Sequence, residues 1–86
     1  MFCSIDCSEI ANAQELHLTI ARYLNFPHWY GHNLDALYDC LTDLPQDTWL
    51  YLSHWDSSAP WAAGFESVLE DAARDCPSLT VYFERA

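Results

Sequence analysis

Three short segments of apolar, β-branched and aromatic residues alternate along the chain with longer segments of helical periodicity. The predicted strands are residues 2–5, 48–52 and 79–83. The predicted helices begin at Ser8 or Asn12, at Gly31 or His32 and at Trp61 or Phe65, and end near residues 24, 43 and 75. Strands separated by helical crossovers pair in parallel. We therefore expect a two-layer α/β fold, with a three-stranded parallel sheet and helices packed on one face, as a single domain over residues 1–86.

Proline and turn residues separate these elements. Pro27 breaks the first helix, Pro77 ends the third, and residues 44–47 form a turn. Residues 54–60 are predicted to be a loop.

The charge balance limits the classes of partner. The chain has 13 Asp and Glu residues, three Arg and no Lys, for a net charge of -10. Direct binding of nucleic acid or of an anionic membrane needs clustered cations, so we expect neither. Disorder is excluded because 51% of the residues are hydrophobic and 15% aromatic. The start of the chain lacks the pattern of a secretion signal and no stretch is a predicted membrane span, so we expect a cytoplasmic protein.

The four cysteines allow a disulfide or a metal site. Cys3 and Cys7 could form one zinc-ligand pair, and His28 and His32 another. Without a secretion signal, reduced structural cysteines are the favoured reading. We expect no cofactor and no metal.

The second predicted helix has two opposite faces. On a helical wheel of about 100° per residue, Leu37, Leu41 and Leu44 fall within about 80° of Leu34, which predicts a core-facing stripe. Asp35, Asp39 and Asp43 lie opposite, one turn apart, and we call these three the acidic ridge. Like charges at this spacing destabilise a helix by roughly 0.2–0.5 kcal/mol per pair. Two explanations of the acidic ridge remain. An acidic protein can place three aspartates on one exposed face by chance. Alternatively, the ridge is a binding site for a cationic partner, which would explain why a destabilising arrangement is present.

Aromatic residues flank the acidic ridge. Trp29 and Tyr30 precede the helix, and Tyr38 lies between its apolar and acidic faces. Tyr and Trp beside charged groups are typical of interface hot spots, although Trp29 or Tyr30 could equally pack in the core. The remaining tryptophans are predicted to be structural: Trp49, Trp55 and Trp61.

Catalytic readings are weak. Paired carboxylates are typical of glycoside hydrolases, but a chain of 86 residues has little room for a sugar cleft. Gly31 and Gly64 are the only glycines, which excludes a glycine-rich phosphate loop, and no histidine has an evident nucleophile beside it. We expect a protein that is not an enzyme.

The stretch from Pro27 to Asp43 reads PHWYGHNLDALYDCLTD and closely resembles the barstar family. The signature there is an aromatic pair, then Gly-x-Asn-Leu-Asp-Ala-Leu, an aromatic residue and Asp. A weaker resemblance covers Gly64–Leu69, and the order of strands and helices agrees along nearly the whole chain. The resemblance implies an inhibitor of a basic toxin ribonuclease of the barnase class or a related one. The inhibitor would be of the antitoxin or immunity type and would act as a 1:1 complex.

The resemblance also implies roles for individual residues. Asp39 would enter the phosphate-binding pocket of the ribonuclease, and Asp35 would pair with another active-site Arg. Trp29 takes the place of an aromatic residue that packs on the catalytic His. The full predicted partner-binding set is Trp29, Tyr30, Gly31, Asn33, Asp35, Tyr38, Asp39, Thr42 and Asp43.

Three positions depart from the family pattern. Asp43 and Leu44 stand where the family often has Gly and an aromatic residue. Arg74 stands where an acidic contact is expected late in the third helix, with Asp71 and Asp75 close by. These departures indicate that the partner is not barnase itself but a toxin with a differently charged rim. An acidic binding module for another basic protein, or for a nuclease toxin of another type, is the alternative.

Overall fold

The computed structural model describes residues 1–85. Along these residues the elements follow in the order β1 (Phe2–Asp6), α1 (Ala13–Leu24), α2 (Leu34–Thr42), β2 (Thr48–Trp55), α3 (Ala62–Asp75) and β3 (Leu79–Arg85). The predicted order of strands and helices is confirmed.

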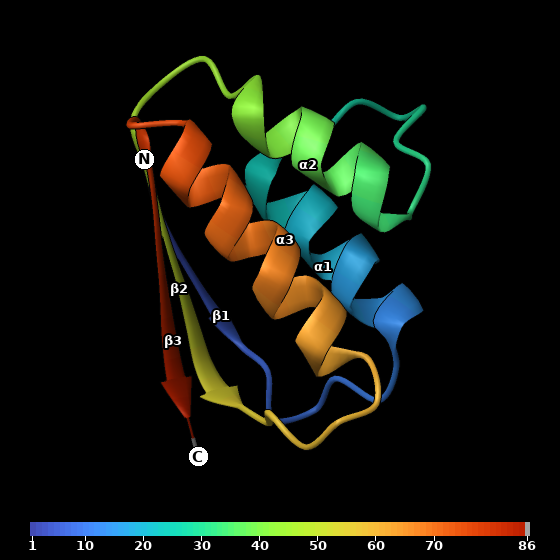
Figure 1. The fold of residues 1–86 in the computed structure, drawn as a ribbon. Coiled ribbons are helices and arrows are strands. Elements are labelled where there is room, and N and C mark those ends of the chain that lie inside the picture. Colours follow the sequence, from blue (N-terminus) through green and yellow to red (C-terminus); the bar gives the residue numbers. More distant parts are fainter. Residues whose placement is uncertain (86) are drawn as a thin grey trace.

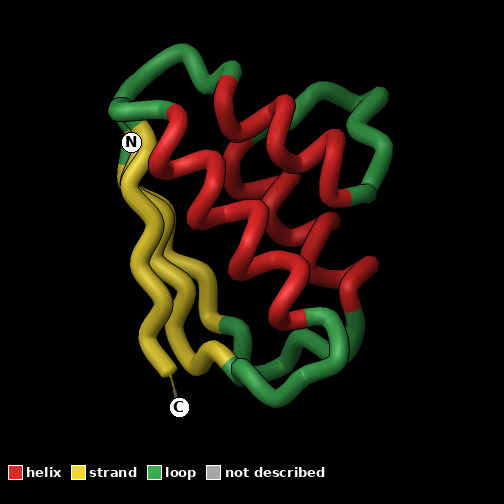
Figure 2. The backbone as a smooth tube through the Cα atoms, in the orientation of Figure 1, coloured by secondary structure: helices red, strands yellow, loops and turns green. Residues whose placement is uncertain are grey.

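The three strands form one parallel sheet with β2 in the middle. Figures 1 and 2 show α1, α2 and α3 on one side of this sheet, so the predicted two-layer α/β architecture is confirmed. Alternate strand residues face the helices, as the twofold periodicity of a strand requires. The fully buried core includes Ile5, Leu16, Ile20, Leu37, Leu41, Leu50, Leu52, Trp55, Phe65 and Leu69.

β2 extends to Trp55 and is therefore longer than predicted. The prediction that residues 54–60 form a loop was wrong for residues 54 and 55, which belong to β2. His54 has a left-handed backbone (φ 55°), and the pairing with β3 shifts register between Leu52 and Trp55. A bulge of this kind turns the next side chain toward the other face of the sheet. Trp55 is consequently 1% exposed and lies in the core, where its indole N–H donates to Oε2 of Glu66 at 2.8 Å.

Trp49 differs from its predicted structural role. It belongs to β2 but points to the face of the sheet that no helix covers, and it is 49% exposed. Phe2 and Tyr82, on the neighbouring strands, are also exposed. A strand pattern alone does not show which face of a sheet lacks a covering layer.

Local capping explains where α1 begins and ends. The side chain of Asn12 accepts a hydrogen bond from the Glu15 N–H, and the Glu15 carboxylate accepts one from the Ala11 N–H. The first bond satisfies a backbone donor that the first turn leaves free, and the second holds the residue before the cap. At the other end, Asn25 adopts a left-handed conformation (φ 57°), a common helix terminator.

All four cysteines are free thiols. Burial raises the pKa of Cys7 to about 11, and the nearby charge of Asp6 adds to the effect. Within residues 1–85, His, Cys, Asp and Glu side chains form no group of three or more that could hold a metal ion. No helix in this part of the chain is both long and apolar enough to cross a membrane.

Candidate functional site

α2 places its acidic and apolar residues on opposite sides. Leu37 and Leu41 are fully buried, whereas Asp35 and Asp39 are exposed, as the periodicity predicted. Helix α2 begins at Leu34 rather than at Gly31 or His32, because His32 has a left-handed backbone (φ 51°) that cannot belong to a right-handed helix.

Asp43 completes the acidic ridge from outside the helix. It is the C-cap of α2, with φ -110° and ψ 15°, and its N–H bonds the carbonyl of Cys40 at 3.3 Å. Leu44 follows in the turn and is only half-buried, so it is not part of the helical stripe. The last turn of α2 is tighter than an α-helical turn, so Asp43 departs from the regular spacing that Asp35 and Asp39 keep.

The carboxylates of the acidic ridge have no ion-pair partner within the described residues 1–85. Along residues 1–85, the ion pairs of Arg74 and Arg85 involve Asp71, Asp75 and Glu66, and none involves the ridge. Within this part of the chain, no ion pair offsets the repulsion between the ridge carboxylates. A cationic partner would remove this repulsion on binding.

The segment between α1 and α2 directs its two adjacent aromatic residues in opposite directions. Trp29 is 71% exposed, whereas Tyr30 is 5% exposed. The expectation that Tyr30 contacts a partner does not fit this position, because its ring packs against Phe26 and His32 and its hydroxyl lies 2.6 Å from Nδ1 of His17. Burial raises the pKa of Tyr30 and lowers that of His17.

A second polar contact fastens the same segment to α1. Nε2 of Gln14 lies 2.9 Å from Nδ1 of His32. Sequence reasoning did not identify His17, Gln14 or His32 as supports of the site. His17 and Gln14 support the site only because the fold places α1 close to the segment between α1 and α2.

Gly31 and Asn33 form the entry into α2. The side-chain oxygen of Asn33 accepts from the Ala36 N–H at 2.8 Å, and its amide nitrogen donates to the Gly31 carbonyl at 3.2 Å. A β-carbon on Gly31 would lie 2.9 Å from that amide nitrogen, closer than side chains normally approach. The Gly-x-Asn pattern therefore has a structural cause in this helix cap.

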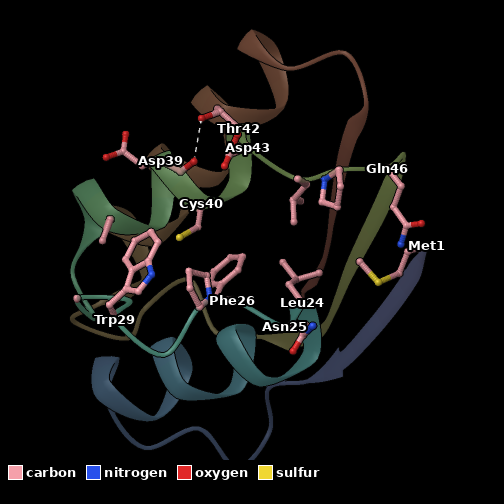
Figure 3. A pocket seen from close by; sticks show the side chains of 15 residues that line it. Met1, Leu24, Asn25, Phe26, Trp29, Asp39, Cys40, Thr42, Asp43 and Gln46 are labelled. Atoms are coloured by element: carbon pink, nitrogen blue, oxygen red, sulfur yellow. Dashed lines mark hydrogen bonds between the residues drawn. The ribbon is translucent and has the colours of Figure 1, made fainter.

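A groove of about 910 Å³ runs between α2 and the segment that precedes it (Figure 3). The thiol of Cys40 points into the groove, while the carboxylate of Asp39 projects outward from α2 (Figure 3). Trp29 lies at one end of the groove, with Met1 and Gln46 at the other (Figure 3). The groove and the ridge together form a concave, partly apolar surface with an acidic border.

Two further predicted residues lie at the edge of this surface. Thr42 donates its hydroxyl hydrogen to the carbonyl of Tyr38 at 2.9 Å, so its polar group is used mainly within α2. Tyr38 is half-buried, and its hydroxyl donates to Oδ2 of Asp75 on α3 at 2.5 Å. The structure thus brings the end of α3 beside the acidic ridge, a contact that the sequence pattern did not predict.

Comparison with known proteins agrees with the resemblance to the barstar family. The model of the family described as Barstar (barnase inhibitor) matches residues 1–84. A protein of Bacillus subtilis (strain 168) named "Putative ribonuclease inhibitor YrdF" is 50% identical over 44 residues, which are 48% of this chain and 48% of that protein. The aligned part therefore spans about half the length of that relative. Because the family model matches almost the entire sequence, the chain belongs to the barstar family.

Proposed function

We propose that the chain is a ribonuclease inhibitor that covers the active site of a basic, barnase-class toxin ribonuclease with α2 and the segment before it. The observation that carries this proposal is the acidic ridge, which is exposed and has no cation paired with it within residues 1–85. A ribonuclease active site is built to bind phosphate. Carboxylates can occupy such a site through charge-assisted hydrogen bonds to its Arg, Lys and His groups.

In this arrangement Asp39, in the middle of α2, occupies the phosphate-binding pocket. Asp35 reaches a second cation one turn away, and Trp29 packs against the active-site surface. An exposed tryptophan beside carboxylates supports this role, because aromatic residues of this kind supply much of the energy at protein interfaces. Gly31, Asn33, Tyr38, Thr42 and Asp43 complete the contact surface.

Tyr30 has a different role in the proposal. Because it is buried against His17, it supports the binding segment from below instead of touching the ribonuclease. This support matters for affinity, since a segment that is ordered before binding loses less conformational entropy in the complex.

The proposed inhibitor acts as a single domain over residues 1–86, in a 1:1 complex, and it acts by binding rather than by catalysis. An antitoxin or immunity role follows, because a cell that makes a toxic ribonuclease must block the enzyme in its own cytoplasm. The net charge of -10 supports a basic partner. Opposite net charges accelerate association, as in the barnase–barstar pair, which is itself a standard case of this steering.

Inhibition of RNA cleavage by barnase tests the proposal directly. The wild-type chain should inhibit barnase at concentrations up to the micromolar range, because the phosphate site is common to the class. The inhibition should be weaker than that of its own partner, because the rim is charged differently. Asp39→Ala and Asp35→Ala should each weaken inhibition by more than about 30-fold, the effect of a 2 kcal/mol hot spot. Glu9→Ala is the control, because it removes one exposed carboxylate outside the proposed surface.

Two outcomes would contradict the proposal. One is a wild-type chain that leaves barnase fully active at micromolar concentration. The other is inhibition that survives both ridge substitutions as well as it survives Glu9→Ala. A salt series gives an independent check, because the association rate should fall as sodium chloride rises, with a smaller slope for the ridge variants.

A further inference from the structure

The contact between Tyr38 and Asp75 joins two helices at the border of the proposed binding surface. Tyr38 lies in the middle of α2, next to the acidic ridge, and Asp75 is the last residue of α3. The phenol hydroxyl donates to Oδ2 of Asp75 at 2.5 Å. The side chain of Tyr38 is therefore tied at its far end to the neighbouring helix.

The carboxylate of Asp75 is held from a second side. Nε of Arg74 donates to Oδ1 of Asp75 at 3.2 Å, while Nη1 of Arg74 donates to Oδ1 of Asp71 at 2.9 Å. Both oxygens of Asp75 thus have a donor, one from each helix. These two donors also lower the pKa of Asp75, so it is a charged acceptor at neutral pH.

Helix stabilisation alone does not account for this arrangement. The Arg74–Asp71 pair has the i,i+3 spacing of an ordinary helix pair, and exposed pairs of this kind contribute little to stability. The bond from Tyr38 to Asp75 is different, because it crosses between helices and its donor belongs to the predicted partner-binding set. Its most direct consequence is the orientation of the Tyr38 ring.

We propose that Asp75 is a positioning residue of the partner-binding surface, which acts through the hydroxyl of Tyr38. The inference rests on the proposed function, since it concerns the affinity for the ribonuclease. A ring held in its bound orientation loses less rotational freedom when the partner packs on it. Arg74 contributes by fixing the carboxylate that holds the ring.

A double-mutant cycle with barnase as the probe tests this inference. Asp75→Ala and Tyr38→Phe should each raise the inhibition constant by about 3- to 10-fold, and the double variant should be no weaker than the weaker single variant. Asp75→Asn should retain most of the affinity, because its amide oxygen can still accept from the phenol. Glu70→Ala, which removes an exposed charge from the same helix, is the control for long-range electrostatics.

A measurement on the free protein reports the contact itself. The hydrogen bond to Asp75 raises the pKa of Tyr38, so ultraviolet titration of Asp75→Ala should show one tyrosine that ionises at lower pH than in the wild type. Tyr38→Phe identifies that tyrosine by removing its transition. An unchanged titration in Asp75→Ala would overturn the inference.

Failure of the inference is distinguishable from failure of the proposed function. Two results would overturn only the positioning role while the ridge variants still lose inhibition. In one, Asp75→Ala raises the inhibition constant as much in the Tyr38→Phe background as in the wild type. In the other, Asp75→Ala raises the inhibition constant no more than Glu70→Ala does. If wild-type chain leaves barnase active, the proposed function and the inference that depends on it both fail.

Discussion

Nδ1 of His17 on α1 lies 2.6 Å from the hydroxyl oxygen of Tyr30, beneath the segment that carries the exposed Trp29. The imidazole is buried between the rings of Phe65 and His32, at centroid distances of 4.7 and 6.4 Å. One buried pair thus connects the core of the fold to the segment that enters α2. A protein surface that must bind a partner without rearrangement needs such support from below.

The first prediction concerns stability at mildly acidic pH. Burial, with a smaller effect from the charge of His32, lowers the pKa of His17 in the folded chain. The unfolded chain therefore binds the proton more tightly, and the free energy of unfolding should fall as the pH drops below the ordinary histidine pKa of about 6.5. The loss should continue until the pH passes the lower pKa of the folded state.

Urea denaturation between pH 7.5 and 5 measures this slope. His17→Gln keeps a polar side chain near Tyr30 but cannot titrate, so its slope should be shallower than that of the wild type. His28→Gln makes the same exchange at an exposed histidine and is the control for the substitution itself. Equal slopes for wild type and His17→Gln would show that another group titrates in this range.

The second prediction contrasts the two ends of the acidic ridge. Asp35 lies in the first turn of α2 and interacts favourably with the helix dipole, whereas Asp43 lies at the C-cap, where the dipole is unfavourable for an anion. Asp35→Asn should lower the free energy of unfolding by up to about 0.5 kcal/mol, because relief of the repulsion from Asp39 offsets part of the lost dipole interaction. Asp43→Asn should raise the free energy of unfolding by roughly 0.3–1 kcal/mol. Denaturation at low ionic strength tests this, and the same sign for both variants would contradict it.

The third prediction concerns the two glycines. Gly31→Ala pushes the Asn33 amide out of the helix cap and should cost about 0.5–2 kcal/mol of stability, the range for loss of an N-cap. Gly64→Ala is the matched comparison inside α3, where the added β-carbon meets only the flexible end of Leu34 at 3.0 Å. The gain in helix propensity should offset that contact, to within about 1 kcal/mol. Thermal denaturation that finds Gly64→Ala the more harmful change would contradict this account.

The fourth prediction concerns the buried indole of Trp55. Glu66 accepts from its N–H at 2.8 Å and also receives a hydrogen bond from Arg85 at 3.2 Å. Glu66→Ala leaves the indole N–H without this acceptor and should cost about 1–3 kcal/mol. Glu66→Gln keeps an acceptor oxygen, so chemical denaturation should find it closer to wild type, and Arg85→Ala, which leaves the acceptor in place, should cost less than Glu66→Ala.

Much of the fold was predictable because it depends on local periodicity. The strand around Leu50, the helix that buries Leu37 and Leu41, and the helix cap at Asn12 all follow from residue spacing and capping chemistry. The end of β2 was not predictable in the same way. The left-handed backbone of His54 turns the side chain of Trp55 to the face of the sheet that the helices cover. Nothing in the residue types there indicates a bulge.

In the candidate site, too, some features follow from local periodicity and others depend on tertiary packing. By itself, the sequence determined that acidic residues lie opposite leucines on the second helix and that the chain carries a barstar-like signature. Only the tertiary structure decided which aromatic residue is exposed, because Trp29 and Tyr30 are adjacent and chemically alike, and the partner at His17 comes from another helix. The contact from Tyr38 to Asp75 likewise spans 37 positions. Periodicity describes one element at a time, whereas such contacts depend on how separate elements pack.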